Sequence, residues 1–511
     1  MGYKEIDLRI PLNVNDEELK QYITKKTGIR KFNFHIILKS LDARNKRNIY
    51  WQYRVGIESN EIQSGEKPAY KSFEIPRRHY KQKVLVVGSG PAGIFSAIIL
   101  SMAGMKVTLI ERGSKVNHRK NKIIEFESKG TFNESNNYAF GEGGAGTFSD
   151  GKLTSRTKSI SVERNFIFRT FIDSGAPEEI MYMTHPHLGS DNLFNITSNL
   201  RKKFEALGGE ILFNTMLDDI KIEGNKVLGA VTSQGIIDAD FFVIAPGHSA
   251  FETYRMLIRR GVTFQIKNFA IGMRAEHPQQ LINKAQWGVD KLPGIKAAEY
   301  RLTSSDNVNS AVYSFCMCPG GIIVPATAYK HTNIVNGMSV YLRDNFWANA
   351  AVVAGISPFE LLGSETTPME ILDWLEKLEN KFYRYSDSYQ APSIIIQDFL
   401  NNKISSKLPE SSYPFGLISA DINELLPQKI TESLKAGLQS FSKRLKGYEK
   451  GVLVGLESKT SSPIQALRNK ENFSSGYSNL FIAGEGSGWA GGIVSSAADG
   501  IKVALALLQK A

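Results

Sequence analysis

The chain has 511 residues, of which 42% are hydrophobic and 22% are charged. This composition can bury a substantial core and excludes a disordered or fibrous protein, while the length favours two or three domains over one. The longest apolar runs have strand length, so the sequence predicts no transmembrane span. There is no secretory signal pattern, and the two cysteines are too few for a disulfide framework, so we expect a cytoplasmic protein.

The formal net charge is +11, and much of the excess lies early in the chain. Residues 1–81 contain 17 lysines and arginines against 10 aspartates and glutamates, which is a difference of +7. A basic surface attracts an anionic ligand, an anionic membrane surface or nucleic acid. The charge alone does not decide between these partners.

Residues 1–81 are predicted to form a small basic α/β domain followed by a linker. A helix begins at Asn15 or Asp16 and runs through Lys25. Alternating apolar residues indicate three strands, over Glu5–Pro11, Asn33–Lys39 and Ile49–Ile57. The stretch 63–82 contains glycine and proline and is typical of a linker.

Beyond residue 82, a buried strand runs directly into a glycine-rich turn and an apolar helix. The turn has the pattern G-x-G-x-x-G. Gly88 permits the tight turn, Gly90 lets the backbone approach a pyrophosphate, and Gly93 lets the helix pack closely against the strand. The helix N-terminus presents N–H groups to the phosphates. The next strand ends in Glu111, where an acidic side chain meets the ribose of an adenosine, so this segment predicts a dinucleotide site.

A second glycine-rich run spans residues 141–146 and is followed by Thr147, Ser149 and Lys152. Its backbone N–H groups suit contacts with a cofactor or its phosphates. The G-K-[ST] spacing of a Walker A loop is absent. A flexible surface loop is the alternative interpretation.

The rest of the chain alternates between strand-rich and helical regions. Strands are predicted over 209–245, and His248 then follows as either a satisfied loop side chain or an acid–base group. Residues 266–345 are rich in strand-like segments, whereas 368–447 are mainly helical. A strand, a glycine turn and a helix return at 479–508. We therefore predict a discontinuous dinucleotide-binding domain, 82–265 plus 450–511, around a substrate or cap domain, 266–449.

Segments along nearly the whole chain resemble a family of bacterial FAD-dependent dehydrogenases, most of whose members are labelled uncharacterised. The similar segments are Ser40–Arg44, the Gly88 motif, Gly141–Lys152, Ile271–His277, Tyr313–Gly321, Glu457–Pro463 and the tail from Asn479. More distantly, the layout is similar to FAD enzymes of the glutathione-reductase and succinate-dehydrogenase type. The resemblance implies an α/β fold: a Rossmann-like FAD-binding domain with an inserted α+β substrate domain and a small N-terminal α/β domain.

The resemblance also narrows the dinucleotide to FAD. The segment 242–248 is similar to the family's internal A-T-G loop, and 479–486 is similar to its distal FAD motif. Glu485 stands where the family more often has aspartate, which bonds the ribityl chain or the pyrophosphate. The last helix would direct its N-terminus at the flavin pyrimidine ring. The predicted cofactor-binding residues are Gly88, Gly90, Pro91, Ala92, Gly93, Glu111, Arg112, Gly144, Gly146, Thr147, Leu217, Gly247, Gly484, Glu485, Gly492 and Ile493.

Catalytic residues are harder to predict. Cys316 and Cys318 form a C-x-C pair that could attack the flavin or pass electrons through a disulfide, so they are redox candidates. Inert packing is the alternative, and a metal site is disfavoured because no histidine lies nearby in the sequence. Lys459 stands where the family pattern has arginine, which loses bidentate recognition of an anion.

These observations favour an FAD-dependent oxidoreductase in which hydride or electrons pass through flavin N5. The expected partner is a small-molecule substrate, with an anionic one favoured by the charge. No second glycine unit is visible, so NAD(P)H would bind only transiently. Two alternatives stay open: an RNA-associated flavoprotein that docks through its basic N-terminal domain, and a protein in which FAD is purely structural.

Overall fold

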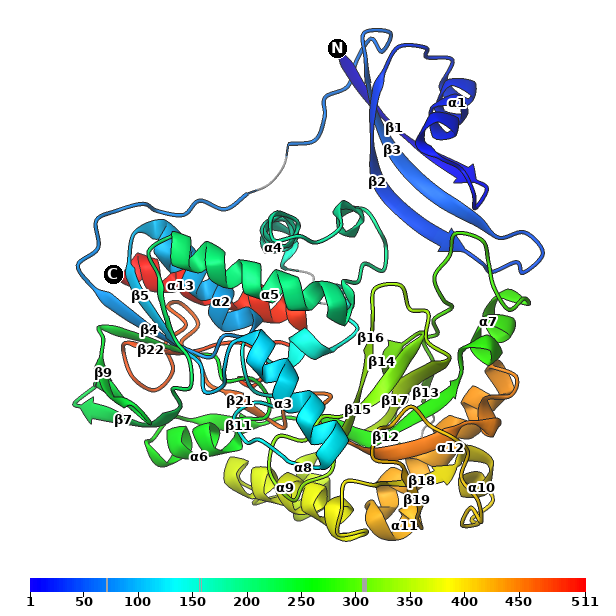
Figure 1. Cartoon of the computed structure of the whole chain (residues 1–511). Coiled ribbons are helices and arrows are strands. Elements are labelled where there is room, and N and C mark those ends of the chain that lie inside the picture. The colour runs from blue at the N-terminus through cyan, green and yellow to red at the C-terminus, as the bar shows by residue number, and fades with distance from the viewer. Residues whose placement is uncertain (70–71, 156, 158, 306–309) are drawn as a thin grey trace.

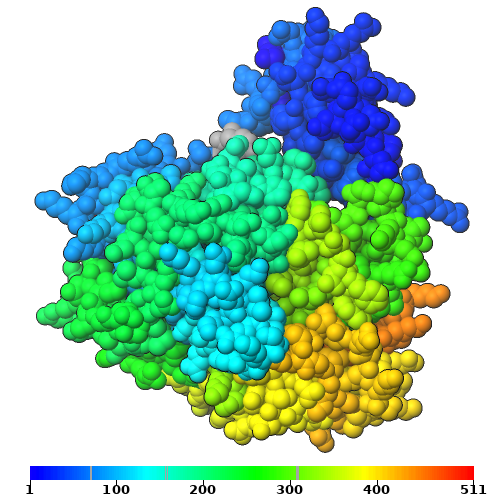
Figure 2. Space-filling view, viewed as in Figure 1, coloured from blue at the N-terminus to red at the C-terminus, as the bar shows by residue number. Residues whose placement is uncertain are grey.

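The computed structural model describes residues 1–69, 72–155, 157, 159–305 and 310–511. A small N-terminal unit projects from a larger body, and a long segment connects the two (Figures 1 and 2). The body contains one parallel sheet and one larger, mainly antiparallel sheet. Within the described ranges, no helix is long and apolar enough to cross a membrane.

The N-terminal unit is a three-stranded antiparallel sheet with one helix against it. The sheet has the order β1 (Gly2–Ile10), β3 (Tyr50–Ser59) and β2 (Asn33–Asp42). The helix α1 (Asp16–Thr27) begins where the sequence predicts, because Asn15 and Glu18 form a reciprocal capping box. The apolar residues of α1 pack against every second residue of the strands. Together they form a hydrophobic core that belongs to the N-terminal unit.

Several contacts between described residues join this unit to the body. Lys39 of β2 pairs with Met183 of the body in a short parallel bridge, and Met183 packs against the core of the N-terminal unit. At the far end of β2, the amino group of Lys46 donates to the carbonyl of Ala285, 2.7 Å away. The unit is therefore attached by backbone pairing as well as by the connecting segment.

The parallel sheet has five strands and is buried on both faces. Its strands, in order, are β22 (Leu480–Ile482), β10 (Phe241–Ile244), β4 (Lys83–Val87), β5 (Lys106–Ile110) and β6 (Glu210–Leu212). One face packs against helices, which are α2 (Pro91–Ala103), α4 (Ser161–Asp173), α5 (Gly189–Ala206) and α13 (Ile493–Lys510). The other face packs against the antiparallel sheet of β7 (Leu217–Glu223), β8 (Lys226–Thr232) and β9 (Gly235–Asp238), and against α6 (Phe251–Arg259). Burial on both faces explains the continuous apolar run in β4.

Two glycines bring the central elements of this layer close together. A Cβ atom on Gly93 would lie 1.8 Å from the carbonyl oxygen of Gly88, so only glycine lets α2 approach the turn after β4. A Cβ atom on Gly500 of α13 would lie 2.1 Å from the carbonyl oxygen of Ala92 in α2. The packing role predicted for Gly93 therefore matches its position, and α13 crosses α2 equally closely.

The second large sheet has seven strands. Their order is β13 (Thr303–Ser304), β14 (Val312–Cys318), β17 (Trp347–Ile356), β12 (Phe269–Pro278), β20 (Val452–Glu457), β18 (Ala391–Ile395) and β19 (Leu417–Ser419). A hairpin of β15 (Gly321–Pro325) and β16 (Val335–Ser339) and a pair of β11 (Phe264–Ile266) and β21 (Ile464–Ala466) accompany it. The helices of this half are α3 (Val116–Lys129), α7 (Gln279–Trp287), α8 (Pro358–Leu362), α9 (Pro368–Arg384), α10 (Ile396–Leu400), α11 (Ile422–Leu425) and α12 (Gln428–Arg444) (Figure 1).

This sheet differs from the sequence prediction in two places. The region predicted as mainly helical, 368–447, also contributes β18 and β19. The strand β20 pairs with β12 and β18 in this sheet, although the prediction groups residues 450–511 with the dinucleotide-binding segments. A short strand carries no sign of its partner in its own sequence, so neither pairing was visible locally.

Candidate active site

A cavity of about 1010 Å³ lies between the two large sheets. The residues that follow four parallel strands line it: Gly88 after β4, Glu111 after β5, Ala245 after β10 and Ala483 after β22. Residues of β14 and Asn336 of β16 line the other side. Ligands of open α/β sheets bind at the carboxyl ends of the strands, and this volume is at the upper end of the ligand-pocket range of about 300–1,000 Å³. The cavity is therefore large enough for a cofactor together with a substrate.

The predicted cofactor residues converge on this cavity. All of them except Gly93 and Thr147 line it. Gly93 lies behind the turn, against Gly88. The Thr147 hydroxyl lies 3.4 Å from that of Thr197 in α5, and Thr147 lines a separate cavity of about 30 Å³. A direct contact between Thr147 and the contents of the large cavity is not supported by this geometry.

Two helix N-termini open onto the cavity. Gly90 is the N-cap of α2 and Gly492 is the N-cap of α13, and neither helix has a side chain that caps its first N–H groups. Both caps line the cavity. Free N–H groups and the helix dipole favour an anion at such ends. A Cβ atom on Gly247 or Gly492 would meet no other atom within 4 Å, so the backbone lies open to a ligand there. These features fit a dinucleotide with a pyrophosphate.

Glu111 has a different hydrogen-bonding pattern from the one predicted. One carboxylate oxygen accepts from the backbone N–H and the hydroxyl of Ser89, at 3.0 and 2.7 Å. The other accepts from the N–H groups of Gly113 and Gly141, at 3.0 and 3.1 Å. Four donors fill the lone-pair sites of a carboxylate, so a ribose hydroxyl would have to replace one of them. Glu111 thus ties together the loops around the cavity as well as lining it.

Arg112 forms part of the same edge. Its guanidinium carbon lies 4.0 Å from the centre of the Phe140 ring, and its Nη2 pairs with Glu252. Burial lowers the pKa of Arg112, which still leaves it cationic at neutral pH. The residue is therefore a fixed cation beside Glu111, within reach of an anionic or aromatic part of a ligand.

The carboxyl of Glu485 faces the cavity and accepts no hydrogen bond from any residue that the structure describes. Burial raises the pKa of Glu485 to about 7, against the opposing effect of Lys267. Lys267 itself donates to the carbonyl of Gly488 at 2.7 Å. A carboxyl that is half protonated at neutral pH can donate to or accept from a hydroxyl-bearing ligand. This property suits the ribityl contact that the family resemblance implies.

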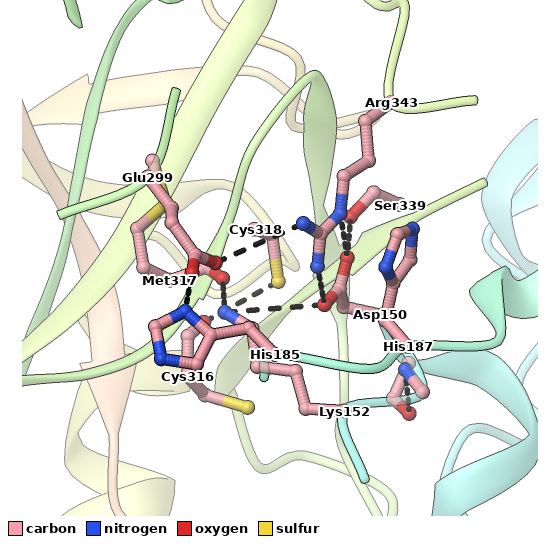
Figure 3. A network of polar contacts seen from close by, with 12 residues as sticks. Asp150, Lys152, His185, His187, Glu299, Cys316, Met317, Cys318, Ser339 and Arg343 are labelled. Atoms are coloured by element: carbon pink, nitrogen blue, oxygen red, sulfur yellow. Dashed lines mark hydrogen bonds and ion pairs between the residues drawn. The ribbon is translucent and has the colours of Figure 1, made fainter. Parts of the chain in front are cut away.

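The opposite side of the cavity carries a group of charged residues (Figure 3). We call Lys152, His185, Glu299, Arg301 and Arg343, all of which line the cavity, the charged wall. Behind it, buried Asp150 accepts from the Nε and Nη2 of Arg343 at 3.1 and 2.6 Å. Lys152 donates to the carbonyl of Met317, and its amino group lies 3.9 Å from Asp150. Only Lys152 of this wall was singled out from the sequence. The other four lie in segments with no motif, so no local signal marks them.

The two cysteines occupy different environments. Cys316 lines the cavity, whereas Cys318 is fully buried behind it, and their sulfur atoms point to different sides (Figure 3). Cys316 has a φ of +45°, and buried Arg274 donates to its carbonyl at 2.6 Å. Burial raises the pKa of both thiols, that of Cys318 to about 12. Both thiols are therefore protonated at neutral pH, and this arrangement does not favour the predicted disulfide relay.

His248 and Lys459 lie near each other at the cavity. His248 bonds Ser249 through Nδ1 at 2.7 Å, and burial, followed by the charge of Lys459, lowers the pKa of His248 to about 3. The amino group of Lys459 pairs with Glu379 at 2.7 Å. His248 is therefore neutral at physiological pH and already bonded, which favours the satisfied loop side chain over the acid–base group.

Comparison with known proteins agrees with an FAD-dependent protein. Residues 268–460 match a family described as FAD-dependent protein, C-terminal domain-like, residues 81–133 match an FAD binding domain, and residues 3–58 match a domain of unknown function. An uncharacterized protein of Clostridium beijerinckii is 38% identical over 525 residues, which cover 98% of each chain. A thiamine thiazole synthase of Aeropyrum pernix is 26% identical over 36% of this chain and 62% of its own. The crystal structure of FqzB covers 85% of this chain and 77% of its own, with 13% identity and a TM-score of 0.37.

The fold, the cavity and the family matches define an FAD-dependent oxidoreductase. The chain belongs to the family of bacterial FAD-dependent proteins that includes the Clostridium beijerinckii protein. The FAD and the oxidoreductase class predicted from the sequence are thereby confirmed. The RNA-associated alternative gains no support from these matches.

Proposed function

We propose that FAD lies along the carboxyl edge of the parallel sheet and that its flavin faces the charged wall, where a small anionic substrate binds. In this arrangement Glu111, Arg112 and Leu217 hold the adenosine end. The N-terminus of α2 holds the pyrophosphate, and the glycine loop 144–146 together with the N-terminus of α13, at Gly492 and Ile493, holds the flavin. Bound FAD supplies two-electron chemistry, because oxidised flavin takes up a hydride equivalent.

The observation that carries this proposal is the continuity of one cavity. The same 1010 Å³ space is lined by the predicted cofactor residues at one side and by the charged wall at the other. A substrate on that wall would share one space with the cofactor, so that a hydride could pass directly between them. Three cations of the wall, Lys152, Arg301 and Arg343, line the cavity against one carboxylate, Glu299, which supports an anionic substrate.

Reduction by transiently bound NAD(P)H and a cytoplasmic location stay predictions. The proposed FAD occupies the carboxyl-edge part of this cavity, so NAD(P)H would have to reach the flavin through the substrate side.

The substitution Gly90→Val tests the cofactor placement. A Cβ atom on Gly90 would have its nearest contact at 3.9 Å, so the fold tolerates a side chain there, but that side chain would fill the space next to the N-terminus of α2. We expect FAD affinity to fall at least about tenfold, or roughly 1.4 kcal/mol, with unchanged circular dichroism. Gly355→Ala, on β17 with its nearest Cβ contact at 3.8 Å, is the control that keeps FAD.

The anaerobic absorbance of the bound flavin tests the reaction class. We expect dithionite and at least one small organic anion to bleach the flavin and an added acceptor to restore it. Undiminished FAD binding by Gly90→Val would contradict the placement. A bound flavin that dithionite cannot bleach would contradict its role in redox chemistry.

A further inference from the structure

We propose that His185, oriented by Glu299, is the catalytic base that accepts the hydroxyl proton of a small 2-hydroxy acid, whose carboxylate binds the cations of the charged wall. This inference rests on the proposed function and adds the substrate class and the proton acceptor to it. Its support comes from the geometry of the pair, from the way the fold anchors it, and from the state of the other candidate bases.

His185 and Glu299 form a closely bonded pair on the cavity surface. Nδ1 of His185 lies 2.5 Å from Oε1 of Glu299, and both residues line the cavity (Figure 3). When Nδ1–H donates to the carboxylate, the lone pair of the imidazole is on Nε2. No residue in the described ranges bonds Nε2. A carboxylate that fixes the tautomer of a histidine, with the other nitrogen free, is the arrangement of a general base.

Glu299 is ionised in this environment. Burial raises its pKa, but the hydrogen bond from His185 and the charges of Lys152 and Arg343 lower it to about 2. Arg343 Nη1 lies 3.7 Å from the second carboxylate oxygen, and Arg343 is itself held by buried Asp150. The charged groups that act on Glu299 are therefore His185, Lys152 and Arg343. The carboxylate can stabilise an imidazolium when His185 takes up a proton.

The backbone on both sides of His185 is anchored. Before it, the N–H of Thr184 donates to the carbonyl of Lys39 in the N-terminal unit, 3.0 Å away. After it, the carbonyl of Pro186 accepts from Leu153 at 2.9 Å, and His187 pairs with Lys152. A catalytic group needs such support, because a misplaced base loses its rate advantage. The same pairing brings Lys152 and His185 to one wall.

Other groups on the cavity are less suited to accept a proton. His248 is bonded to Ser249 and its pKa is lowered to about 3, so it is a weak base. The pKa of Cys316 is raised by burial, which keeps the sulfur protonated. Glu485 lies on the cofactor edge, after β22. His185 is therefore the best-placed base on the charged wall.

The chemistry of the pair indicates the substrate. When a carbinol is oxidised, its C–H bond pair leaves as hydride to oxidised FAD and its O–H proton must go to a base, so that C–OH becomes C=O. His185 Nε2 accepts that proton, and the product of a 2-hydroxy acid is a 2-oxo acid. Amine oxidation does not need a base of this kind once the amine is neutral. The carboxylate of the acid matches Lys152, Arg301 and Arg343, of which Arg301 has no acidic partner among the described residues.

Anaerobic stopped-flow measurements on the FAD-loaded protein test the inference. The probes are a panel of 2-hydroxy acids, the matching 2-amino acids, and matching alcohols without the carboxylate. We expect only the hydroxy acids to bleach the flavin rapidly. His185→Gln should slow that bleaching about 100-fold or more, the usual contribution of a general base, and should abolish the acidic limb of its pH profile. Imidazole should partly restore bleaching in His185→Ala.

Two controls separate the base from the rest of the site. His118→Gln changes an exposed histidine of α3 and should behave as wild type. Dithionite should bleach every variant equally. Calorimetric binding of oxalate gives a readout without turnover: Arg301→Met and Lys152→Met should weaken it at least tenfold, whereas His185→Gln should leave it nearly unchanged. Binding of the substrate carboxylate and transfer of the proton are thereby measured separately.

Several results would overturn the inference. A flavin that dithionite bleaches but no 2-hydroxy acid bleaches removes the substrate class while the proposed function stands. Faster bleaching by the amino acids or the simple alcohols has the same consequence. A His185→Gln variant that bleaches at the wild-type rate would show that His185 is not the base. Failure of dithionite to bleach the flavin contradicts the proposed function itself.

Discussion

Glu485 illustrates how one residue combines a sequence motif with a property that only burial creates. In the sequence it is the acidic residue of the distal FAD motif. In the structure its carboxyl faces the cavity with no bond from the described residues, and burial raises its pKa to about 7. The corresponding unfolded residue titrates near 4.5. The FAD-free protein therefore binds an extra proton on folding between these two values.

This difference predicts a pH dependence of stability. Because the folded pKa is the higher one, the protonated carboxyl favours the folded state, and stability falls as pH rises from about 4.5 to about 7. Glu485→Gln, which stays neutral, should remove that fall. Chemical denaturation of FAD-free wild type and variant at pH 5 and pH 8 measures it. The variant should gain stability relative to wild type at pH 8, and a gain of equal size at both pH values would contradict the prediction.

At the scale of elements, the last helix shapes the cofactor site from a distance. Asp499 lies in the second turn of α13, and its Oδ2 accepts from the N–H of Gly484 at 2.7 Å. The same carboxylate pairs with Arg468 at 2.8 Å. The helix thus holds the loop after β22, which lines the cavity, in addition to presenting its own N-terminus. Gly500, near the middle of α13, lets this helix pack against the first turn of α2 at Ala92.

Loss of the hydrogen bond between Asp499 and Gly484 should make the loop after β22 more mobile. We expect Asp499→Ala to weaken FAD binding about tenfold, because Gly484 loses its acceptor and buried Arg468 loses its partner. Asp499→Asn keeps an oxygen for Gly484 and should weaken binding less. Fluorescence titration of FAD into the two FAD-free variants provides the measurement. Equal affinities for both variants would show that the charge matters and the bond to Gly484 does not.

At the scale of the whole molecule, the N-terminal unit is attached to the wall that carries His185. Lys39 of β2 pairs with Met183, two residues before His185, and Figure 1 shows β2 descending onto this part of the body. Met183 of the body packs against the hydrophobic core of the N-terminal unit. The basic unit is therefore placed to influence the substrate side of the cavity, while the cofactor edge lies on the other sheet.

Detaching the N-terminal unit should affect the substrate side of the cavity and leave the cofactor side unchanged. Met183→Asp puts a charge into the packing between unit and body, so we expect faster proteolysis in the segment 63–82 and slower flavin bleaching by substrate. FAD affinity should stay within about twofold, because the cofactor edge is not touched. Leu228→Asp, at an exposed position of β8, is the control. A parallel loss of FAD would show that the unit supports the whole body.

The sequence by itself determined what short-range chemistry encodes. Gly88, Gly90 and Gly93 with the strand and helix around them predicted a dinucleotide site, because a glycine turn acts through the backbone within a few residues. The resemblance of the later loops at Gly247 and Glu485 to a known family narrowed this dinucleotide to FAD. The start of the first helix at Asn15 or Asp16 and the mainly helical character of 368–447 were visible in the local sequence as well.

Only the tertiary structure decided what depends on distant partners. The strands β18, β19 and β20 join one sheet across the chain, and Lys152, His185, Glu299 and Arg343 come from four separate segments to one wall. The tertiary structure also turned Thr147 away from the cavity and kept the sulfurs of Cys316 and Cys318 apart. Hydrogen bonds and charge pairs form wherever the folded backbone brings the groups together, and no local sequence pattern predicts these contacts.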